Sequence, residues 1–422
     1  MHPSWKWLIP AACLASCTPN PPAPVSIMVM DKTTQGLVPT AVDFQTINDT
    51  YALKGLAATF VGGARIVVDP NDPLYDAAQT DDQLRRLALK SEGADVRLNL
   101  KSGGETLIPV DFHSWNMASA YYNYERAFLH FQALAVIPDD EIRETRVFYF
   151  PTYTNTSLSS QPLKDNALFD PTTQSFMLLP YEKFQRVPFA MSAGVIAHEF
   201  FHRIWHKRIY GASGRPLLIE SWIGQGALNV LKSYDEGLAD FHAFAASCSL
   251  PTGCDYSFSF LEETLGASFA QARRIDQNSR CMDPTLYQEL TTGGLNFLSL
   301  ERHFQLGTVI ATALYHAGSR RGGAWGSLEQ GALRALSDST PNRRGIFELA
   351  NANIATPAYF TLFRVANSIV QHVDLTDPPA AQLLCEEFAT RFGMGPTTIA
   401  EQMPQCSAAS GNRSVCTQQV VP

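Results

Sequence analysis

The chain has 422 residues, 45% of them hydrophobic and 17% charged, and its formal net charge is −8 at pH 7. This length exceeds one average domain and predicts two or three, with enough apolar residues to bury a core. The acidic balance argues against a nucleic-acid-binding protein, because such proteins use a basic surface.

Residues 1–17 have the pattern of a secretory signal peptide. Lys6 precedes an apolar run that is too short to span a bilayer. The run ends in Leu14-Ala15-Ser16-Cys17, which resembles the lipobox of bacterial lipoproteins. That resemblance implies an exported protein anchored to a lipid bilayer through acylated Cys17, with Thr18 favouring the outer membrane. The alternative is an ordinary secretory signal in which the cysteine occurs by chance.

The next two segments differ in composition. Residues 18–40 begin with a cluster of prolines and predict an extended tether. Residues 41–112 show short β-like runs, for example 58–61 and 96–100, broken by turn residues. This β-rich region is either an inhibitory prodomain or the N-terminal β part of a larger catalytic unit.

The remaining chain predicts a catalytic region in two lobes, followed by a tail. Residues 113–211 contain an aromatic-rich helix expected to pack in the core, strands at 146–150 and 175–179, and a helix that begins near Pro188. Residues 212–393 are mostly helical, and residues 394–422 form a small polar tail with two cysteines. Strands followed by helices predict an α+β fold.

The cysteines suggest disulfides. Setting aside the signal peptide and Cys17 leaves six of the eight cysteines, an even number in an exported protein. Their spacing favours the local pairs Cys248–Cys254 and Cys406–Cys416, which would leave Cys281 to pair with Cys385. A cysteine zinc site is disfavoured because two CxxC pairs are absent from the sequence.

The segment His198-Glu199-Phe200-Phe201-His202 has the spacing of a zinc site. Helical residues four apart differ by about 40° around the axis and about 6 Å along it, so both imidazoles can reach one ion. Glu199 follows the first ligand and can act as a general base at the open position of the metal.

A zinc hydrolase needs a third protein ligand. His206 lies about 12 Å beyond His198 along the same helix, too far to reach the same ion. A later histidine such as His242 has no supporting context. Glu236 is favoured because Asp240 lies one helical turn further on. Glu236 can bind the metal while Asp240 accepts the free N–H of a ligand histidine.

This set of residues resembles the gluzincin zinc metallopeptidases, especially the thermolysin-like and fungalysin-like enzymes. They combine HExxH with a glutamate in an E-x-x-x-D pattern on the following helix. The resemblance covers roughly residues 160–320 and implies a thermolysin-like fold, one catalytic Zn²⁺ and hydrolysis of peptide bonds. The interval from His202 to Glu236 is longer than in thermolysin, which implies an inserted segment.

The same resemblance extends to substrate-binding residues. Asn166-Ala167-Leu168-Phe169 is similar to the family's edge segment, which holds an extended peptide as an added strand; a plain β-turn is the alternative. His303, followed after three residues by glycine, matches the family's oxyanion-stabilising histidine, and the alternative is a core residue in a buried helix. The family's substrate-carbonyl arginine has three candidates: Arg273, Arg274 and Arg280.

The sequence therefore predicts an exported, membrane-anchored zinc metallopeptidase that acts on extended peptides or proteins. The alternative is a non-catalytic lipoprotein in which this fold serves as a binding or assembly module, but Glu199 would then have no evident role. A calcium ion around Asp69–Asp82 is a second cofactor to consider, beside a solvated acidic loop.

Overall fold

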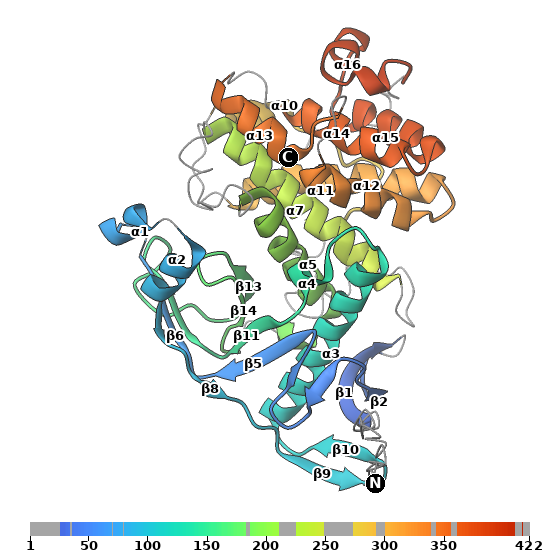
Figure 1. The fold of residues 1–422 in the computed structure, drawn as a ribbon. Helices are drawn as coiled ribbons and strands as arrows, with labels where there is room; N and C mark the ends of the chain where they lie inside the picture. Colours follow the sequence, from blue (N-terminus) through green and yellow to red (C-terminus); the bar gives the residue numbers. More distant parts are fainter. Residues whose placement is uncertain are drawn as a thin grey trace, which may run out of the picture.

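The structure is a computed structural model of the chain. It describes residues 26–33, 36–69, 71–78, 80–182, 186–210, 225–248, 273–292, 300–338, 343–355, 361–409 and 416. The signal peptide, the lipobox cysteine and Cys254 lie outside these ranges. The fold is α+β: the strands belong to the N-terminal part, and the chain after residue 178 is mainly helical (Figure 1).

A seven-stranded sheet is the base of the N-terminal part. Its order is β13–β14–β11–β5–β4–β3, and β8 also pairs with β5. The strands are β3 (Ile47–Asp49), β4 (Lys54–Gly55), β5 (Ala58–Gly62), β8 (Ala94–Asp95), β11 (Thr145–Tyr149), β13 (Ala167–Asp170) and β14 (Ser175–Leu178). Strands β5, β11 and β14 are parallel, whereas β13 runs antiparallel to β14 and forms one edge.

An aromatic helix packs against this sheet. Helix α3 (Phe112–Ala133) begins at Asp111, whose side chain accepts a hydrogen bond from the backbone N–H of Ser114. Tyr124 of α3 contacts the rings of Phe60 on β5 and Phe176 on β14, at centroid distances of 6.0 and 5.0 Å. The aromatic stripe expected in this helix is therefore core packing, and it holds the middle of the sheet in place.

The tether expected over residues 18–40 is wrong from residue 26 onward. Strands β1 (Ser26–Thr33) and β2 (Gly36–Asp43) pair with each other, and β1 also pairs with β10 (Thr106–Pro109), which pairs with β9 (Leu100–Gly103). The alternating residues Ile27 and Val29 are fully buried. This period-two burial is what makes the segment a strand, despite the prolines just before it.

The region 41–112 is joined to the rest of the sheet. Strand β5 lies between β4 and β11, so residues 58–62 supply an inner strand of the sheet that ends in β13. This placement favours the N-terminal β part of one folded unit over a separable prodomain. A third sheet has the order β12–β6–β7 and consists of β6 (Arg65–Val68), β7 (Leu89–Ser91) and β12 (Thr152–Asn155).

Two details of this region differ from the sequence expectation. It contains two short helices, α1 (Pro73–Ala77) and α2 (Asp81–Ala88), and α2 starts with a capping box formed by Thr80 and Gln83. The run 96–100 is not a strand before Leu100. Val96 and Leu98 are buried as the alternation predicts, but burial alone does not supply a ladder of hydrogen bonds.

The helical part is built around α5 and α7. The 3₁₀ turn Phe189–Met191 precedes α5 (Ala193–Trp205), which continues as a π-helical turn over His206–Tyr210. The other helices are α4 (Asp139–Ile142), α7 (Gln225–Ser247), α10 (Pro284–Thr291), α11 (Leu300–Arg320), α12 (Trp325–Ser337), α13 (Ile346–Ala355), α14 (Leu362–Asp374), α15 (Pro378–Arg391) and α16 (Pro396–Gln402). Helix α7 packs against both α5 and α11.

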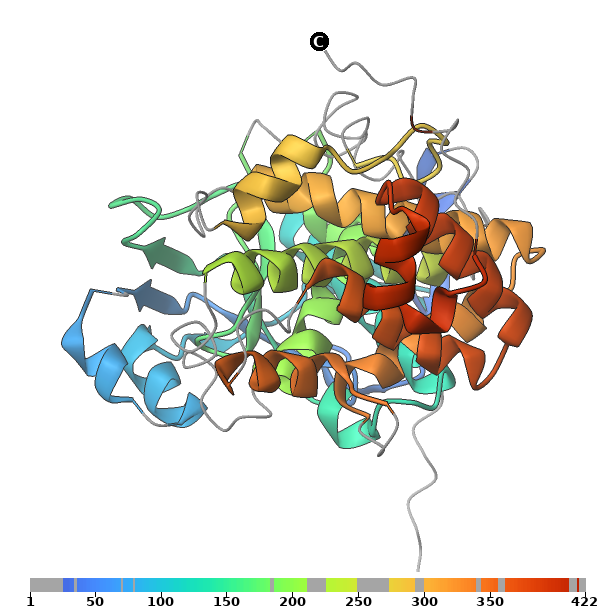
Figure 2. The same ribbon diagram turned by 90° about the horizontal axis from the view of Figure 1, so that it is seen from above.

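The two figures agree on this arrangement. In Figure 1 the sheets lie below and the C-terminal helices above, with α5 and α7 between them. Seen from above in Figure 2, the blue helices α1 and α2 and the red C-terminal helices lie at opposite ends of the molecule. No helix within the described ranges combines the length and the hydropathy needed to cross a bilayer.

Two glycines allow α7 and α11 to cross closely. A Cβ atom added at Gly237 would lie 2.4 Å from the carbonyl oxygen of Gly307, and one added at Gly307 would lie 2.9 Å from the nitrogen of Gly237. Such distances leave no room for a side chain. The crossing lies directly after Glu236 in the chain, so it sets the position of that residue.

The disulfide pairing differs from the expected one. Cys281 pairs with Cys416, and Cys385 pairs with Cys406, in place of the expected pairs Cys406–Cys416 and Cys281–Cys385. Cys248 is also disulfide-bonded. Spacing in the sequence favoured the nearest cysteines, but the fold brings α15 beside the turn at Pro404–Cys406 instead. Disulfides are typical of proteins that fold in an oxidising compartment.

The inner position of β5 can be tested with Phe60→Ala. Phe60 is fully buried against α3, so its truncation should destabilise the protein by about 3–5 kcal/mol. We expect the helical signal in circular dichroism to be lost in one transition at a lower temperature. An unchanged transition of the helical part would mean that residues 41–112 are a separable unit.

Candidate metal centre

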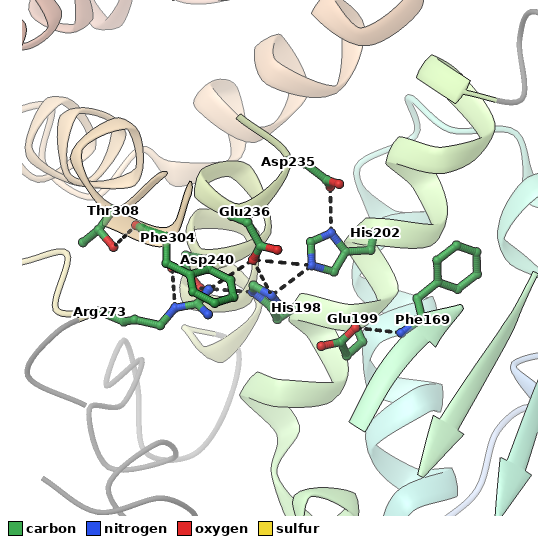
Figure 3. A network of polar contacts seen from close by, with 10 residues as sticks. All are labelled: Phe169, His198, Glu199, His202, Asp235, Glu236, Asp240, Arg273, Phe304 and Thr308. Carbon is green, nitrogen blue, oxygen red and sulfur yellow. Dashed lines mark hydrogen bonds and ion pairs between the residues drawn. The ribbon is translucent and has the colours of Figure 1, made fainter. Parts of the chain in front are cut away.

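Three side chains converge where α5 faces α7 (Figure 3). His198 and His202 lie one turn apart on α5, and Glu236 projects from α7. The two Nε2 atoms are 3.0 Å apart, and Oε2 of Glu236 lies 3.4 Å from that of His198 and 3.7 Å from that of His202. No other group of three histidine, cysteine or acidic side chains lies this close together among the described residues.

Each histidine is oriented by a carboxylate. Nδ1 of His198 lies 3.0 Å from Oδ1 of Asp240, and Nδ1 of His202 lies 2.7 Å from Oδ1 of Asp235. An imidazole that donates from Nδ1 carries its lone pair on Nε2. Both lone pairs therefore point into the same small space as the carboxylate of Glu236.

This donor set fits a zinc ion. Three electron-pair donors within 4 Å of one another repel unless a cation lies between them. Zinc binds imidazole nitrogen at about 2.0–2.1 Å in tetrahedral sites, which places neighbouring ligand atoms about 3.3 Å apart. The observed separations of 3.0, 3.4 and 3.7 Å bracket that value. The residues that would hold the ion are His198, His202 and Glu236.

The charges around the site explain its pKa shifts. Burial opposes the charging of His202, but Asp235 and Glu236 outweigh it and raise the pKa of His202 to about 10. Burial would raise the pKa of Glu236, but His202 and His198 lower it to about 2. The site thus strongly favours positive charge between its carboxylates, whether that charge is a proton or a metal ion.

Glu199 does not join the three ligands. Its Oε2 accepts a hydrogen bond of 2.8 Å from the backbone N–H of Phe169 on β13 (Figure 3). Burial raises the pKa of this carboxylate above its usual range, which favours a role as proton acceptor. The contact also places the edge strand β13 directly beside the metal centre.

Arg273 lies at the site, unlike the other two arginine candidates. Its guanidinium bonds to Asp240 at 2.6 and 3.1 Å and reaches Glu236 at 3.5 Å, while stacking on the ring of Phe304 at 4.3 Å. Arg274 instead pairs with Asp276, and Arg280 contacts Gln277. Arg273 is therefore the candidate placed to meet a ligand of the metal centre.

The remaining histidines have other surroundings. His206 is buried beside the ring of Phe169, and burial lowers its pKa to about 3. Nδ1 of His242 lies 2.9 Å from Oε1 of Glu329, which Nε2 of His130 also contacts at 2.8 Å. Neither His206 nor His242 belongs to the ligand group.

His303 is buried on α11, and its Nε2 lies 3.1 Å from Oδ1 of Asn229. Burial lowers its pKa to about 4, so the imidazole is neutral at pH 7. The glycine four residues later, Gly307, has a packing role against Gly237. The oxyanion role of His303 stays a prediction.

The expected substrate segment coincides with an edge strand. Asn166 precedes β13, and its carbonyl accepts a hydrogen bond from the backbone N–H of Leu179, while its side chain accepts one from the backbone N–H of Ala167.

Two of the carboxylates in the segment considered for calcium form hydrogen bonds with the protein. Asp69 accepts hydrogen bonds from Asn71 and Thr156, and Asp72 caps α1.

Sequence reasoning missed Asp235. It directly precedes Glu236, so it points about 100° away around α7 and faces the second histidine. The sequence does show a third carboxylate within one helical turn, but whether Asp235 contacts a histidine depends on how α7 faces α5.

Comparison with models of known protein families found no match, and neither did comparison with curated protein sequences.

The orienting carboxylates can be tested with Asp235→Asn and Asp240→Asn. Each change keeps the shape but weakens the acceptor for an imidazole N–H, so zinc affinity should fall about 10- to 100-fold. Competition with a chelating indicator measures this affinity. Asp276→Asn, at a carboxylate paired with Arg274, serves as the control. Unchanged affinity in both site variants would contradict the assignment.

Proposed function

We propose that this protein is a zinc-dependent peptidase of the gluzincin kind, which hydrolyses peptide bonds in extended substrates. The observation that carries the proposal is the position of Glu199. It lies next to a His-His-Glu group yet is held apart from it by the N–H of an edge strand. A purely structural metal site is normally closed by a fourth protein ligand and needs no such carboxylate.

Bound zinc would supply a Lewis acid and a water of lowered pKa. Glu199 is placed beside the three ligands to take the proton from that water and to pass it to the leaving amine. Arg273 lies at the border of the site, where it donates to Asp240 and Glu236. Asp235 and Asp240 hold the histidines in the required tautomer.

Among the described residues β13 pairs with β14 alone, and this edge position supports a peptide substrate. Neighbouring residues of a strand direct their backbone groups to opposite sides. Since the N–H of Phe169 points to Glu199, the backbone groups of Ala167 point to the same side, away from β14, where the N–H of Ala167 bonds to the side chain of Asn166. A substrate strand added there would pass beside the metal centre.

Export and anchoring are part of the proposal. The disulfides fit an oxidising compartment. Acylation of Cys17 would hold the protein on a membrane. In a bacterium that has two membranes, this would be the outer membrane. Mass spectrometry of the protein extracted from membranes would show the added lipid, and an unmodified N-terminal peptide would contradict the anchor.

The general-base role predicts the effect of Glu199→Gln. The variant should still bind one zinc ion but lose peptide hydrolysis by about 10²- to 10⁴-fold. Metal content and cleavage of an unfolded protein, with and without a chelator, measure the two properties. Hydrolysis at the wild-type rate would rule out this mechanism.

The ligand roles predict a different result for His198→Ala and Glu236→Ala. Both variants should lose the metal itself, because two protein ligands hold zinc weakly. Stoichiometric zinc in Glu236→Ala would remove that residue from the ligand set. A zinc-loaded wild-type protein that cleaves no peptide would favour a non-catalytic binding or assembly module.

A further inference from the structure

A polar cavity of about 230 Å³ lies beside the metal centre, at the end of the β13–β14 hairpin. Its walls come from α2, the start of β11, the hairpin turn and the end of α5. Phe169 belongs to both sites, because its N–H binds Glu199 and the residue also lines the cavity. The volume is below the range of about 300–1,000 Å³ that holds whole small molecules, so it suits one residue of a bound peptide.

The cavity lies at a defined distance from the general base. Its residues Arg203 and Lys207 follow Glu199 by four and eight positions. They therefore lie about 6 and 12 Å beyond Glu199 along the helix. Since an extended peptide advances about 3.3 Å per residue, this span equals about two to four residues. A peptide paired with β13 can thus place one residue at Glu199 and a nearby one in the cavity.

The inner wall of the cavity is cationic. Arg203 is buried and donates to the carbonyl oxygens of Ile142 and Arg143 at 2.9 and 2.8 Å. Lys207 is half-buried, and burial together with Arg203 lowers its pKa. Within the described part of the chain, neither cation forms an ion pair with a carboxylate, although the carboxylates of Asp140 and Glu141 lie near enough to raise the pKa of Lys207 in part. The nearby carboxylate of Glu141 is taken by Arg208 at 2.8 Å.

Most of the other charges of the cavity are paired or solvated. Arg85 and Arg146 share the carboxylate of Glu92, and the exposed carboxylates Asp82 and Glu144 are solvated at the rim. On the acidic side, Asp81 accepts a hydrogen bond from Gln174, its Oδ1 is buried without a hydrogen-bond partner among the described residues, and burial raises its pKa while Lys207 lowers it. A group that enters past this rim meets two partly desolvated cations.

We propose that this cavity is a substrate subsite for a carboxylate, two to four residues from the cleaved bond, with Lys207 as the specificity-determining residue. The inference rests on the proposed peptidase function. The carboxylate can belong to an aspartate or glutamate side chain, or to the C-terminus of the peptide. Both would form a charge-assisted hydrogen bond with Lys207 in a partly desolvated site.

The test uses the zinc-loaded full chain and amidated peptides that differ at one position. Glutamate, glutamine or lysine is placed two, three or four residues to either side of the cleaved bond, and kcat/KM is measured. At one position glutamate should exceed glutamine by about tenfold, the size of one charge-assisted hydrogen bond. A second series ends at that position with a free carboxylate or an amide, which separates the two sources of the charge.

Lys207→Met should bring the glutamate-to-glutamine ratio close to one, and Lys207→Glu should shift the preference to lysine. Lys101→Met removes an exposed charge on β9 and should leave the ratio unchanged. Equal cleavage of all peptides by the wild type, or a preference for lysine, would overturn the subsite alone. Absence of any zinc-dependent hydrolysis would overturn the peptidase function and the subsite together.

Discussion

The structure depends on an excess of negative charge that is held between two helices. Glu199, Asp235, Glu236 and Asp240 surround two imidazoles in a space that admits little water. Carboxylates removed from water repel one another strongly unless a cation lies among them. Arg273 supplies one positive charge from outside, bound to Asp240. A divalent metal ion held by the three ligand atoms would supply further positive charge.

Such a centre holds its geometry only if α5 and α7 cannot move apart. At the Gly237–Gly307 crossing the backbones of α7 and α11 pack in direct contact. The carboxylate of Glu329 on α12 is hydrogen-bonded to His130 on α3 and to His242 on α7. This buried carboxylate therefore connects the helix that covers the sheet with the helix that carries Glu236. The two parts of the molecule meet through polar contacts as well as apolar packing, which fixes their relative position.

Local geometry explains which site residues could be predicted. The spacing of His198 and His202, and that of Glu236 and Asp240, follow from the pitch of a helix, so a short stretch of sequence suffices. Asp235 was missed because its direction depends on the packing of α7 against α5. Arg273 could not be ranked above Arg274, because both lie in an irregular segment and no helix or strand period predicts the direction of their side chains. These residues are determined by tertiary packing, which a single sequence does not reveal.

The same distinction applies to the fold. The α+β order and the long apolar helices were predictable from their patterns. Helix α2 was not, because it buries only Leu84 and Ala88 and its signal is a capping box. The expected pairs Cys406–Cys416 and Cys281–Cys385 were wrong. Short loops are entropically easy to close, but the packing of the C-terminal helices determines which cysteines meet.

The Cys281–Cys416 bond has a consequence for where the site can be assembled. It closes a loop of 135 residues, and such a crosslink removes about 5 kcal/mol of conformational freedom from the unfolded chain. Arg273 and Cys281 both lie in the irregular described stretch 273–283, where Arg391 also donates to the carbonyl of Arg280 at 2.8 Å. In a reducing cytosol this anchor would be absent. Without it, the stretch that places Arg273 against Asp240 would lose one of its covalent attachments to the C-terminal helices, so the redox state of the compartment bears on the completeness of the site.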